Sequence, residues 1–413
     1  MNKNDVRKLY AGSVISWKGV PRVVAATPSP SYAKASSVDV YLYTLDGSST
    51  GFECIALSEI DTNVPQADSD AVKTRFLPML ASLTYPTNGT DPEIFVIDKA
   101  GVIIPAWKFL KSNEETKKIN YGSDVFSYWD GFQAEISTRD GFSCHETMTN
   151  MIQQGLAQIH AAAITYDKDA KFLAADAAKV DRKDLITADD HHVMFGCAPS
   201  ENIYGIEKID ILNPREVPYR FSGTHFHYTL NNFGRTPPAW WPHGVVAMID
   251  KIGGLVLTAL GRDAEDPIRR KFYGRPGEYR SKDNAHLEYR TPGSFLMRHP
   301  ALYIFGADIC RFGFKMGMQM DGRVFDAIPD VKDIILNCDA DAASDIIKQN
   351  ASLFKTIFAK MYGNSIDDMT LALLTDKRRK ATAHIKTIEE EWNVTIRGVL
   401  PPNYRWRNTV QML

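Results

Sequence analysis

The segment Phe221–Leu230 has the sequence FSGTHFHYTL, which is typical of a β-strand. His225 and His227 stand two positions apart in it, so both imidazoles would lie on one face of the strand while Phe226 lies on the other. A lone His-x-His pair is also common in a protein core or on an exposed sheet face. Three further segments of the chain carry the same arrangement, and together the four indicate a functional sheet face.

Each of these three segments also resembles a strand with two polar side chains at positions i and i+2. They are Asp91-Pro92-Glu93, Gln133-Ala134-Glu135 and Glu288-Tyr289-Arg290. Taken singly, the first could begin a strand or a turn, and the last could be a cross-strand ion pair. Taken together, they place carboxylates, imidazoles and a guanidinium on one face of a sheet. Carboxylates bind Mg²⁺ or Mn²⁺ and arginine binds phosphate, so this face suits a nucleoside triphosphate with a divalent metal.

A cluster of basic residues precedes the last of these segments. It contains Arg269, Arg270, Lys271, Arg275 and Arg280, and the glycines and proline among them predict a loop. A triphosphate or an acyl phosphate would be a suitable anionic partner, and surface ion pairs with nearby acidic residues are the alternative. Because the cluster borders the expected metal site in sequence, phosphate binding is favoured. The loop over residues 261–282 could act as a lid.

Composition and charge limit the classes of partner. The chain has 413 residues, 44% of them hydrophobic, and a formal net charge of -2, so there is no bulk positive field for nucleic acid or an anionic membrane. Five widely spaced cysteines without a C-x-x-C pair fit a reducing compartment. We found neither a signal-peptide pattern nor an apolar run near the roughly 18 residues of a membrane helix. These features predict a cytoplasmic protein without a membrane partner.

The chain is expected to contain an α+β core between two smaller regions. Short strands and tight turns in residues 1–65 predict a small SH3-like β-barrel, and turn-forming residues in 66–90 predict a linker. Residues 91–300 form the expected catalytic core. Residues 301–413 are expected to be helical, with helices over 301–318, 339–363 and 366–393. The basic run at 377–380 is interpreted as a solvated helix face rather than a nucleic-acid contact.

Other catalytic motifs fit the sequence less well. It contains no Gly-x-x-x-x-Gly-Lys-Ser/Thr loop, no Gly-x-Gly-x-x-Gly fingerprint and no Gly-x-Ser-x-Gly elbow. Cys197 follows a glycine but has no supporting nucleophile motif, so a buried, inert thiol is the favoured interpretation. Asp189, Asp190, His191 and His192 are consecutive. A metal role is open for them, and a polar loop is preferred.

The motifs in their order along the chain resemble the phage carboxylate–amine ligase type 2 family of amidoligases. That family belongs to the superfamily of glutamine synthetase and glutamate–cysteine ligase. The resemblance covers roughly residues 88–300. It rests on Asp-Pro-Glu at 91–93, Asp130-Gly131-x-x-x-Glu135, Phe195-Gly196-Cys197-x-Pro199, Arg220-x-x-Gly223-x-His225-x-His227, Arg269-Arg270-x-x-Tyr273-Gly274-x-x-Gly277-x-Tyr279-Arg280 and Glu288-Tyr289-Arg290.

The resemblance implies a glutamine-synthetase-like antiparallel sheet that forms a funnel with flanking helices and holds ATP and Mg²⁺ (or Mn²⁺) on its concave face. The implied metal ligands are Asp91, Glu93, Glu135, His225 and Glu288. The residues implied to contact the nucleotide are His227, Arg220, Arg269 and Arg275. Those implied to act on the transferring phosphoryl group are Arg290, Arg280 and Arg270. Gln133 departs from the pattern because it stands where a second carboxylate would strengthen the metal site.

The implied reaction is a two-step ligation that forms an amide or isopeptide bond through an acyl phosphate. Its partners would be small-molecule or peptide carboxylates and amines, with a homo-oligomer or a phage protein as further expected partners. Two alternatives stay open. One is a phage structural or interaction protein that retains a ligase-like fold, and the other is a different ATP-dependent phosphotransferase on the same sheet.

Overall fold

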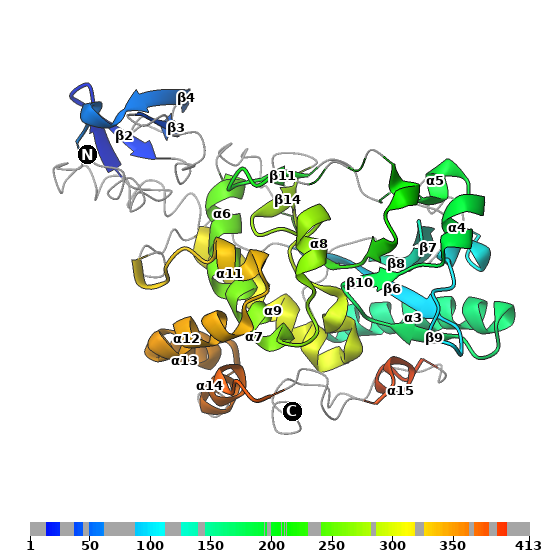
Figure 1. Ribbon diagram of the computed structural model, residues 1–413. Coiled ribbons are helices and arrows are strands. Elements are labelled where there is room, and N and C mark those ends of the chain that lie inside the picture. The colour runs from blue at the N-terminus through cyan, green and yellow to red at the C-terminus, as the bar shows by residue number, and fades with distance from the viewer. Residues whose placement is uncertain are drawn as a thin grey trace.

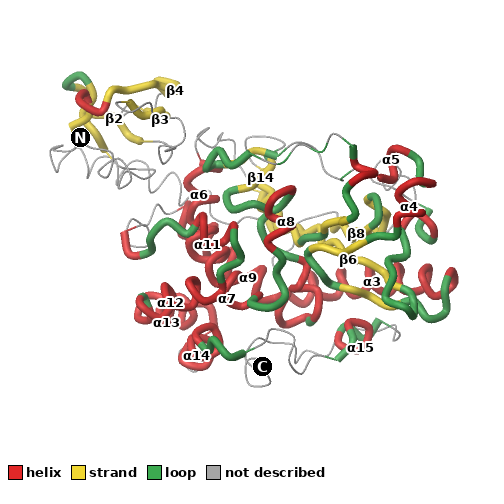
Figure 2. Tube along the Cα trace, in the orientation of Figure 1, coloured by secondary structure: helices red, strands yellow, loops and turns green. Residues whose placement is uncertain are grey.

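An eight-stranded antiparallel sheet with flanking helices forms the centre of the protein in this computed structural model (Figures 1 and 2). The prediction of an α+β core is therefore confirmed at the level of its class and sheet. The structure describes residues 14–24, 37–43, 49–61, 87–111, 125–138, 145–193, 195, 200–207, 209, 211, 213–229, 241–281, 286–318, 326–362, 367–379 and 386–394.

The central sheet places the four predicted polar segments on neighbouring strands. Its order is β11 (Glu201–Asn202), β14 (Glu278–Arg280), β15 (His286–Tyr289), β13 (Thr224–Thr229), β6 (Thr87–Ile97), β8 (Gln133–Thr138) and β7 (Val125–Asp130), and β9 (Lys171–Leu173) also pairs with β6. Strands β15, β13, β6 and β8 are adjacent, and all pairs are antiparallel. Residues 87–90, expected to be linker, belong to β6.

One helix illustrates how the apolar side of this sheet is covered. In Figure 1, α3 (His145–Tyr166) runs along the sheet, where it contacts β7 and β8. Its buried face carries Met148, Ile152, Leu156 and Ile159, as the helical spacing predicts. Gly155 allows the close approach, because a Cβ there would lie 2.6 Å from a methyl group of the Ile136 side chain on β8.

A long apolar helix crosses the core. It consists of α6 (Trp241–Ile249), a π-helical turn η5 (Asp250–Gly254) and α7 (Leu255–Gly261). The stretch Pro242–Gly261 is long and apolar enough to cross a membrane, so the expectation that no apolar run reaches this length is wrong. It is nevertheless 94% buried and packs against α9 (Pro300–Met318) and α12 (Ala340–Gln349). Its apolar composition is that of a core helix and does not indicate a membrane partner.

The C-terminal region is helical: α9 matches the helix predicted over 301–318, whereas the later helices are shorter than predicted. Besides α12 it contains α11 (Lys332–Leu336), α13 (Ala351–Tyr362), α14 (Asp367–Thr375) and α15 (Ile388–Glu391). The predicted helix over 339–363 is divided where Asn350 leaves the helical conformation and its side-chain amide donates to the Ile346 carbonyl. The helix predicted over 366–393 is likewise wrong as one element.

The basic run lies in a turn after α14 and not on a helix. The Asp376 carboxylate accepts a hydrogen bond from the Arg378 amide, which stabilises this turn. Lys377 pairs with Asp345 at 2.8 Å in an exposed position. Lys380 lies outside the described residues. The expectation of a solvated surface holds for Lys377 and Arg378, whereas Arg379 is only partly exposed and burial lowers its pKa. The expectation of a helix is wrong.

The N-terminal region forms a separate five-stranded antiparallel sheet. Its order is β4 (Ser49–Ala56), β3 (Ser37–Tyr43), β2 (Val20–Val24), β1 (Val14–Trp17) and β5 (Ile60–Asp61). The turn between β1 and β2 is formed by Lys18 and Gly19, both with positive φ (53° and 75°). The strands agree with the predicted short β-elements, and the SH3-like barrel stays a prediction.

Shorter elements connect the sheet and the helices. They are β10 (Ala177–Lys179), which pairs with β12 (Tyr219–Phe221), the helices α4 (Arg182–Thr187), α5 (Asp190–Val193) and α8 (Pro267–Phe272), and the 3-10 turns η1 (Leu57–Glu59), η2 (Ala106–Lys108), η4 (Pro214–Glu216) and η6 (Ser294–Arg298).

A buried carboxyl group in the π-helical turn makes the stability of the fold depend on pH. Asp250 is fully buried and its Oδ1 accepts a 2.5 Å hydrogen bond from the hydroxyl of Tyr289 on β15. Burial raises the pKa of Asp250 from 3.8 to about 7, and hydrogen bonds from Tyr289 and Tyr204 partly oppose this rise. The folded protein therefore holds a proton there that the unfolded chain releases near pH 4.

We expect the free energy of unfolding to fall as pH rises from about 4 to about 7, because a raised carboxyl pKa stabilises the fold fully only below the unfolded value. The free energy of unfolding falls by at most roughly 4 kcal/mol, because the pKa of Asp250 rises from 3.8 to about 7 and each pKa unit corresponds to about 1.4 kcal/mol. Urea unfolding across this pH range should show a smaller decline in Asp250→Asn, which keeps the acceptor oxygen. An equal decline in wild type and variant would assign the effect to other groups.

Candidate functional site

The strand register brings the predicted polar residues onto one face of the central sheet. Across β6 and β13, Asp91 is paired with His225, and across β13 and β15, His227 is paired with Glu288. Across β6 and β8, Glu93 is paired with Glu135. Directly paired residues share a face of the sheet, as do residues at i and i+2. The period-two pattern therefore identified a real, continuous polar face.

Three carboxylates on this face form a candidate metal centre. Glu93, Asp130 and Glu135 each offer an oxygen, and these oxygens lie within 4.8 Å of one another. Glu93 and Glu135 are buried, and Asp130 is partly exposed. Asp130 was not predicted as a ligand, although the sequence motif contains it. It ends β7 and pairs with Gln133 across the hairpin, so it supplies a carboxylate where Gln133 had suggested a deficit.

Electrostatics in this cluster favour a bound cation or proton. Burial, reinforced by Asp130, raises the pKa of Glu93 to about 8. Burial also raises the pKa of Glu135 well above its usual value, and the charges of Asp91, Asp130 and Glu93 add to this rise. Three carboxylates that repel one another in a poorly solvated site would ionise together only with a compensating charge.

The donor set of this cluster fits Mg²⁺ or Mn²⁺. Both ions prefer carboxylate oxygens, and Mg²⁺ commonly binds one or two carboxylates and completes its shell with water or phosphate. Neighbouring donors fix the ligands: the Gly223 amide donates to Glu93 at 2.7 Å, and the Tyr128 hydroxyl donates to Glu135. Carboxylates that neighbouring donors orient in this way are typical of metal ligands.

Glu288 contacts the other charged and imidazole side chains in the second half of the polar face. It is fully buried, and its oxygens lie 2.6 Å from Nε of Arg280, 3.3 Å from Nε of Arg290 and 3.4 Å from Nδ1 of His225. Burial, reinforced by Arg290, lowers the pKa of His225 well below its usual value, so this imidazole is neutral. Glu288 thus compensates two guanidinium groups beside a neutral histidine that is chemically able to bind a metal.

Tyr273 links the two halves of the face, and sequence reasoning did not select it. Its hydroxyl lies 3.2 Å from Glu93 Oε1 and also contacts Nε2 of His225. The residue directly follows α8, which places it over the sheet. Its only signal in the sequence was its position inside the arginine-rich motif, where a phenol has no evident role.

His227 and Asp91 form a pair beside the carboxylate cluster rather than within it. His227 Nε2 lies 2.9 Å from Asp91 Oδ2, and its Nδ1 lies 3.0 Å from Nε2 of His286. Burial opposes protonation of His227, but Asp91 outweighs it and raises the pKa of the imidazole. His286 was also absent from the predicted set, although Glu288 stands at i+2 in the same strand and the period-two pattern would have included it.

Four predicted phosphate-binding arginines are engaged in the interior. Arg269 donates to the carbonyls of Thr291 and Pro292 at 2.9 and 3.0 Å, and Arg270 lies 2.8 Å from Glu265. Arg275 is paired with Glu278 at 3.0 Å. All three are almost completely buried. These contacts give the guanidinium groups a structural role, and they direct them to protein acceptors instead of a phosphate.

Arg220 is the fourth of these arginines. It donates to four backbone carbonyls, including those of Val193 and Val217, and its guanidinium lies between the rings of Phe132 and Phe195. Burial lowers its pKa to about 10. Its contacts join the segment before β12 to the end of α5. Arg220 therefore connects loop segments that are distant in the sequence.

The arginine-rich segment 261–282 differs from the loop that was predicted. It contains α8 and β14, and Arg269 joins it to the chain after β15. Gly223 and Gly274 make room for this guanidinium, since a Cβ at either position would lie within 2.5 Å of it. The segment is therefore an integral part of the folded structure, and it covers the polar face.

No protein-family model matches the sequence, and comparison with curated proteins gives no significant match. The resemblance to amidoligases accordingly stays a prediction that rests on the motifs alone.

Proposed function

We propose that the protein is an ATP-dependent carboxylate–amine ligase that uses Mg²⁺ or Mn²⁺. The observation that carries this proposal is the acidic cluster of Glu93, Asp130 and Glu135 on the same sheet face as Arg280, Glu288 and Arg290. One part of the face has the donors for a divalent cation, and the other has guanidinium groups for phosphate oxygens. Their union on one sheet is the arrangement that phosphoryl transfer requires.

The acidic cluster would hold the metal through Glu93, Asp130 and Glu135. A bound divalent cation would neutralise negative charge on the phosphate oxygens of ATP. The raised pKa values of Glu93 and Glu135 support this assignment, because an ion would relieve the repulsion among the carboxylates. His225 is neutral and lies beside Glu288, which suits it to a further metal contact.

Arg280 and Arg290 would act on the phosphoryl group. Arg280 is partly exposed, with 17% of its side chain accessible, and Arg290 is buried. Arg280 Nε donates a 2.6 Å hydrogen bond to Glu288, and Arg290 Nε lies 3.3 Å from the same carboxylate. Their guanidinium charges would stabilise negative charge on the transferring group, which is the main catalytic contribution a protein makes to such a reaction.

The proposed chemistry has two balanced steps. A substrate carboxylate oxygen attacks the γ-phosphorus of ATP, and the bond to the bridging oxygen breaks to give an acyl phosphate and ADP. An amine nitrogen then attacks the acyl carbon, phosphate leaves, and the nitrogen loses a proton to form the amide. Tyr273 lies over the face between Glu93 and His225 and would help to exclude water, which protects the acyl phosphate from hydrolysis. The reaction would take place in the cytoplasm.

Calorimetric titration with a non-hydrolysable ATP analogue tests this function. We expect wild type to bind the analogue with Mg²⁺ and to bind it at least about tenfold more weakly in EDTA, because the metal compensates both the cluster and the phosphates. Glu135→Gln should lose the dependence on Mg²⁺, whereas Glu207→Gln, which removes an exposed carboxylate, should keep it. Absence of binding to wild type at millimolar analogue would contradict the proposal and favour an interaction protein.

A further inference from the structure

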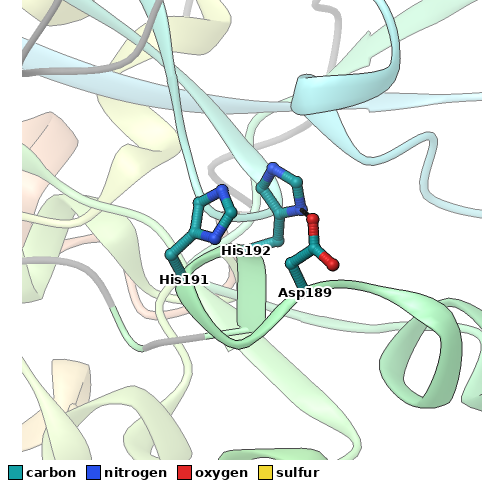
Figure 3. A group of neighbouring side chains, drawn as sticks. All are labelled: Asp189, His191 and His192. Carbon is teal, nitrogen blue, oxygen red and sulfur yellow. Dashed lines mark ion pairs between the residues drawn. The ribbon is translucent and has the colours of Figure 1, made fainter.

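A second group of metal-binding side chains lies outside the acidic cluster. Asp189, His191 and His192 stand at the beginning of α5 and gather their side chains on one side of the turn (Figure 3). One ligand atom from each lies within 4.8 Å of the others. Asp189 and His191 are exposed and His192 is partly buried, so the group is accessible from solvent. The sequence had favoured a polar loop at this position.

The turn that carries these three residues is held in place. Its backbone is closed by a 3.0 Å hydrogen bond from the His192 amide to the Asp189 carbonyl. Arg215 donates to the carbonyls of Leu185 and Ala188 on the preceding segment, and it also pairs with Asp190 at 2.7 Å. Arg215 thereby neutralises the one adjacent carboxylate outside the group. The three side chains project from a fixed turn.

Two tryptophans contact the imidazole rings of this group. His192 stacks on Trp107 with a centroid distance of 4.7 Å and an interplanar angle of 7°, and it meets Trp129 edge-on at 4.8 Å. His191 lies 5.7 Å from Trp129. Stacking uses the flat faces of an imidazole, whereas a metal is bound by a nitrogen at the ring edge. The stacking of His192 on Trp107 is therefore compatible with metal binding.

We propose that Asp189, His191 and His192 form a site for a divalent transition metal of the zinc class. Two imidazole nitrogens and one carboxylate oxygen suit Zn²⁺, Ni²⁺, Co²⁺ or Fe²⁺, whereas Mg²⁺ prefers oxygen ligands. Ligand atoms around tetrahedral zinc lie about 3.3 Å apart at its usual bond lengths. His192 Nδ1 and Asp189 Oδ2 are already 3.9 Å apart, so small rotations of the exposed Asp189 and His191 side chains would close the site.

Three protein ligands leave at least one coordination position for water or a small anionic ligand. The site would also join α5 to the two tryptophans, which come from η2 and β7, because His192 contacts both. It is independent of the proposed ligase activity, since none of its three residues belongs to the acidic cluster or contacts Glu288 in the described part of the chain. Either proposal can fail while the other holds.

Zinc binding to the full chain tests the site. We would titrate Zn²⁺ in millimolar Mg²⁺, which occupies the oxygen-rich cluster, and we expect one Zn²⁺ per chain to bind. His191→Ala and Asp189→Asn should each weaken the affinity by at least about tenfold, because each removes a direct ligand. His160→Ala is the matched control, since His160 lies on α3 and contacts Phe172 instead. It should leave the affinity unchanged.

Co²⁺ gives a second readout that does not depend on the variants being equally stable. Bound in place of Zn²⁺, it should give the visible absorption of a four- or five-coordinate ion in wild type and lose that absorption in His191→Ala, which alters an exposed residue and should remain folded by circular dichroism. Failure of wild type to bind Zn²⁺ at 0.1 mM (about the weakest affinity expected of three such ligands) would overturn the proposal. Unchanged affinity in His191→Ala and His192→Ala would do the same.

Discussion

Replacing Glu93 with glutamine is expected to stabilise the metal-free protein and to weaken its binding of Mg²⁺ by more than about 100-fold. The carboxylate is buried beside two others, and its pKa of about 8 shows that the folded state resists its ionisation. At neutral pH the neutral amide should raise the free energy of unfolding by up to about 3 kcal/mol. Glutamine also keeps a carbonyl oxygen that can accept the hydrogen bond from Gly223.

Urea unfolding with and without Mg²⁺ measures both effects. Wild type should gain stability from Mg²⁺, because an ion that binds only the folded state stabilises it by mass action. Glu93→Gln should start from a higher stability and gain little. Glu207→Gln makes the same change at an exposed position and should behave as wild type. A less stable variant that still responds to Mg²⁺ would make Glu93 a structural hydrogen-bond acceptor and not a metal ligand.

Replacing Glu288 with alanine is expected to lower the free energy of unfolding by about 3–5 kcal/mol, because it removes the shared partner of two guanidinium groups. Arg290 is buried and Arg280 mostly so, and both have Nε within 3.3 Å of a Glu288 oxygen. Neither charge can move far into solvent while the strands stay paired. Denaturant unfolding followed by circular dichroism is the measurement.

A double variant separates the charge effect from lost packing. Glu288→Ala combined with Arg290→Met removes one uncompensated charge together with its partner, so it should be more stable than Glu288→Ala alone. Asp345→Ala, which opens the exposed pair with Lys377, should change little. If the changes in unfolding free energy caused by the substitutions at 288 and 290 simply added, the ion pair would contribute little to the stability of the fold.

The loss of stability at Glu288 also affects how activity is tested. Loss of nucleotide binding in Glu288→Ala could come from partial unfolding as well as from the phosphate site. Glu135→Gln avoids this difficulty, because it reduces charge in a cluster whose members already repel one another. It is expected to separate metal binding from folding.

Much of the polar face was predictable from sequence because a strand has a fixed period. Side chains at i and i+2 always share a face, so Asp91 with Glu93 and His225 with His227 could be grouped without any structure. Helix α3 was predictable for the same kind of reason, since its buried residues follow the helical period. By contrast, helix ends depended on single residues such as Asn350, which propensity alone does not fix.

The sequence by itself determined which face of each strand would be polar, and with it the chemical class of the candidate site. Only the tertiary structure decided which side chains meet there. Asp130 joined the metal centre through the β7–β8 hairpin, and Tyr273 reached Glu93 across 180 positions of sequence. The same holds for the arginines: a guanidinium has five donors, and Arg269 and Arg270 each direct three hydrogen bonds to buried carbonyls or Glu265. The period of a strand determines which way a side chain points, whereas burial and strand pairing determine which residue it contacts.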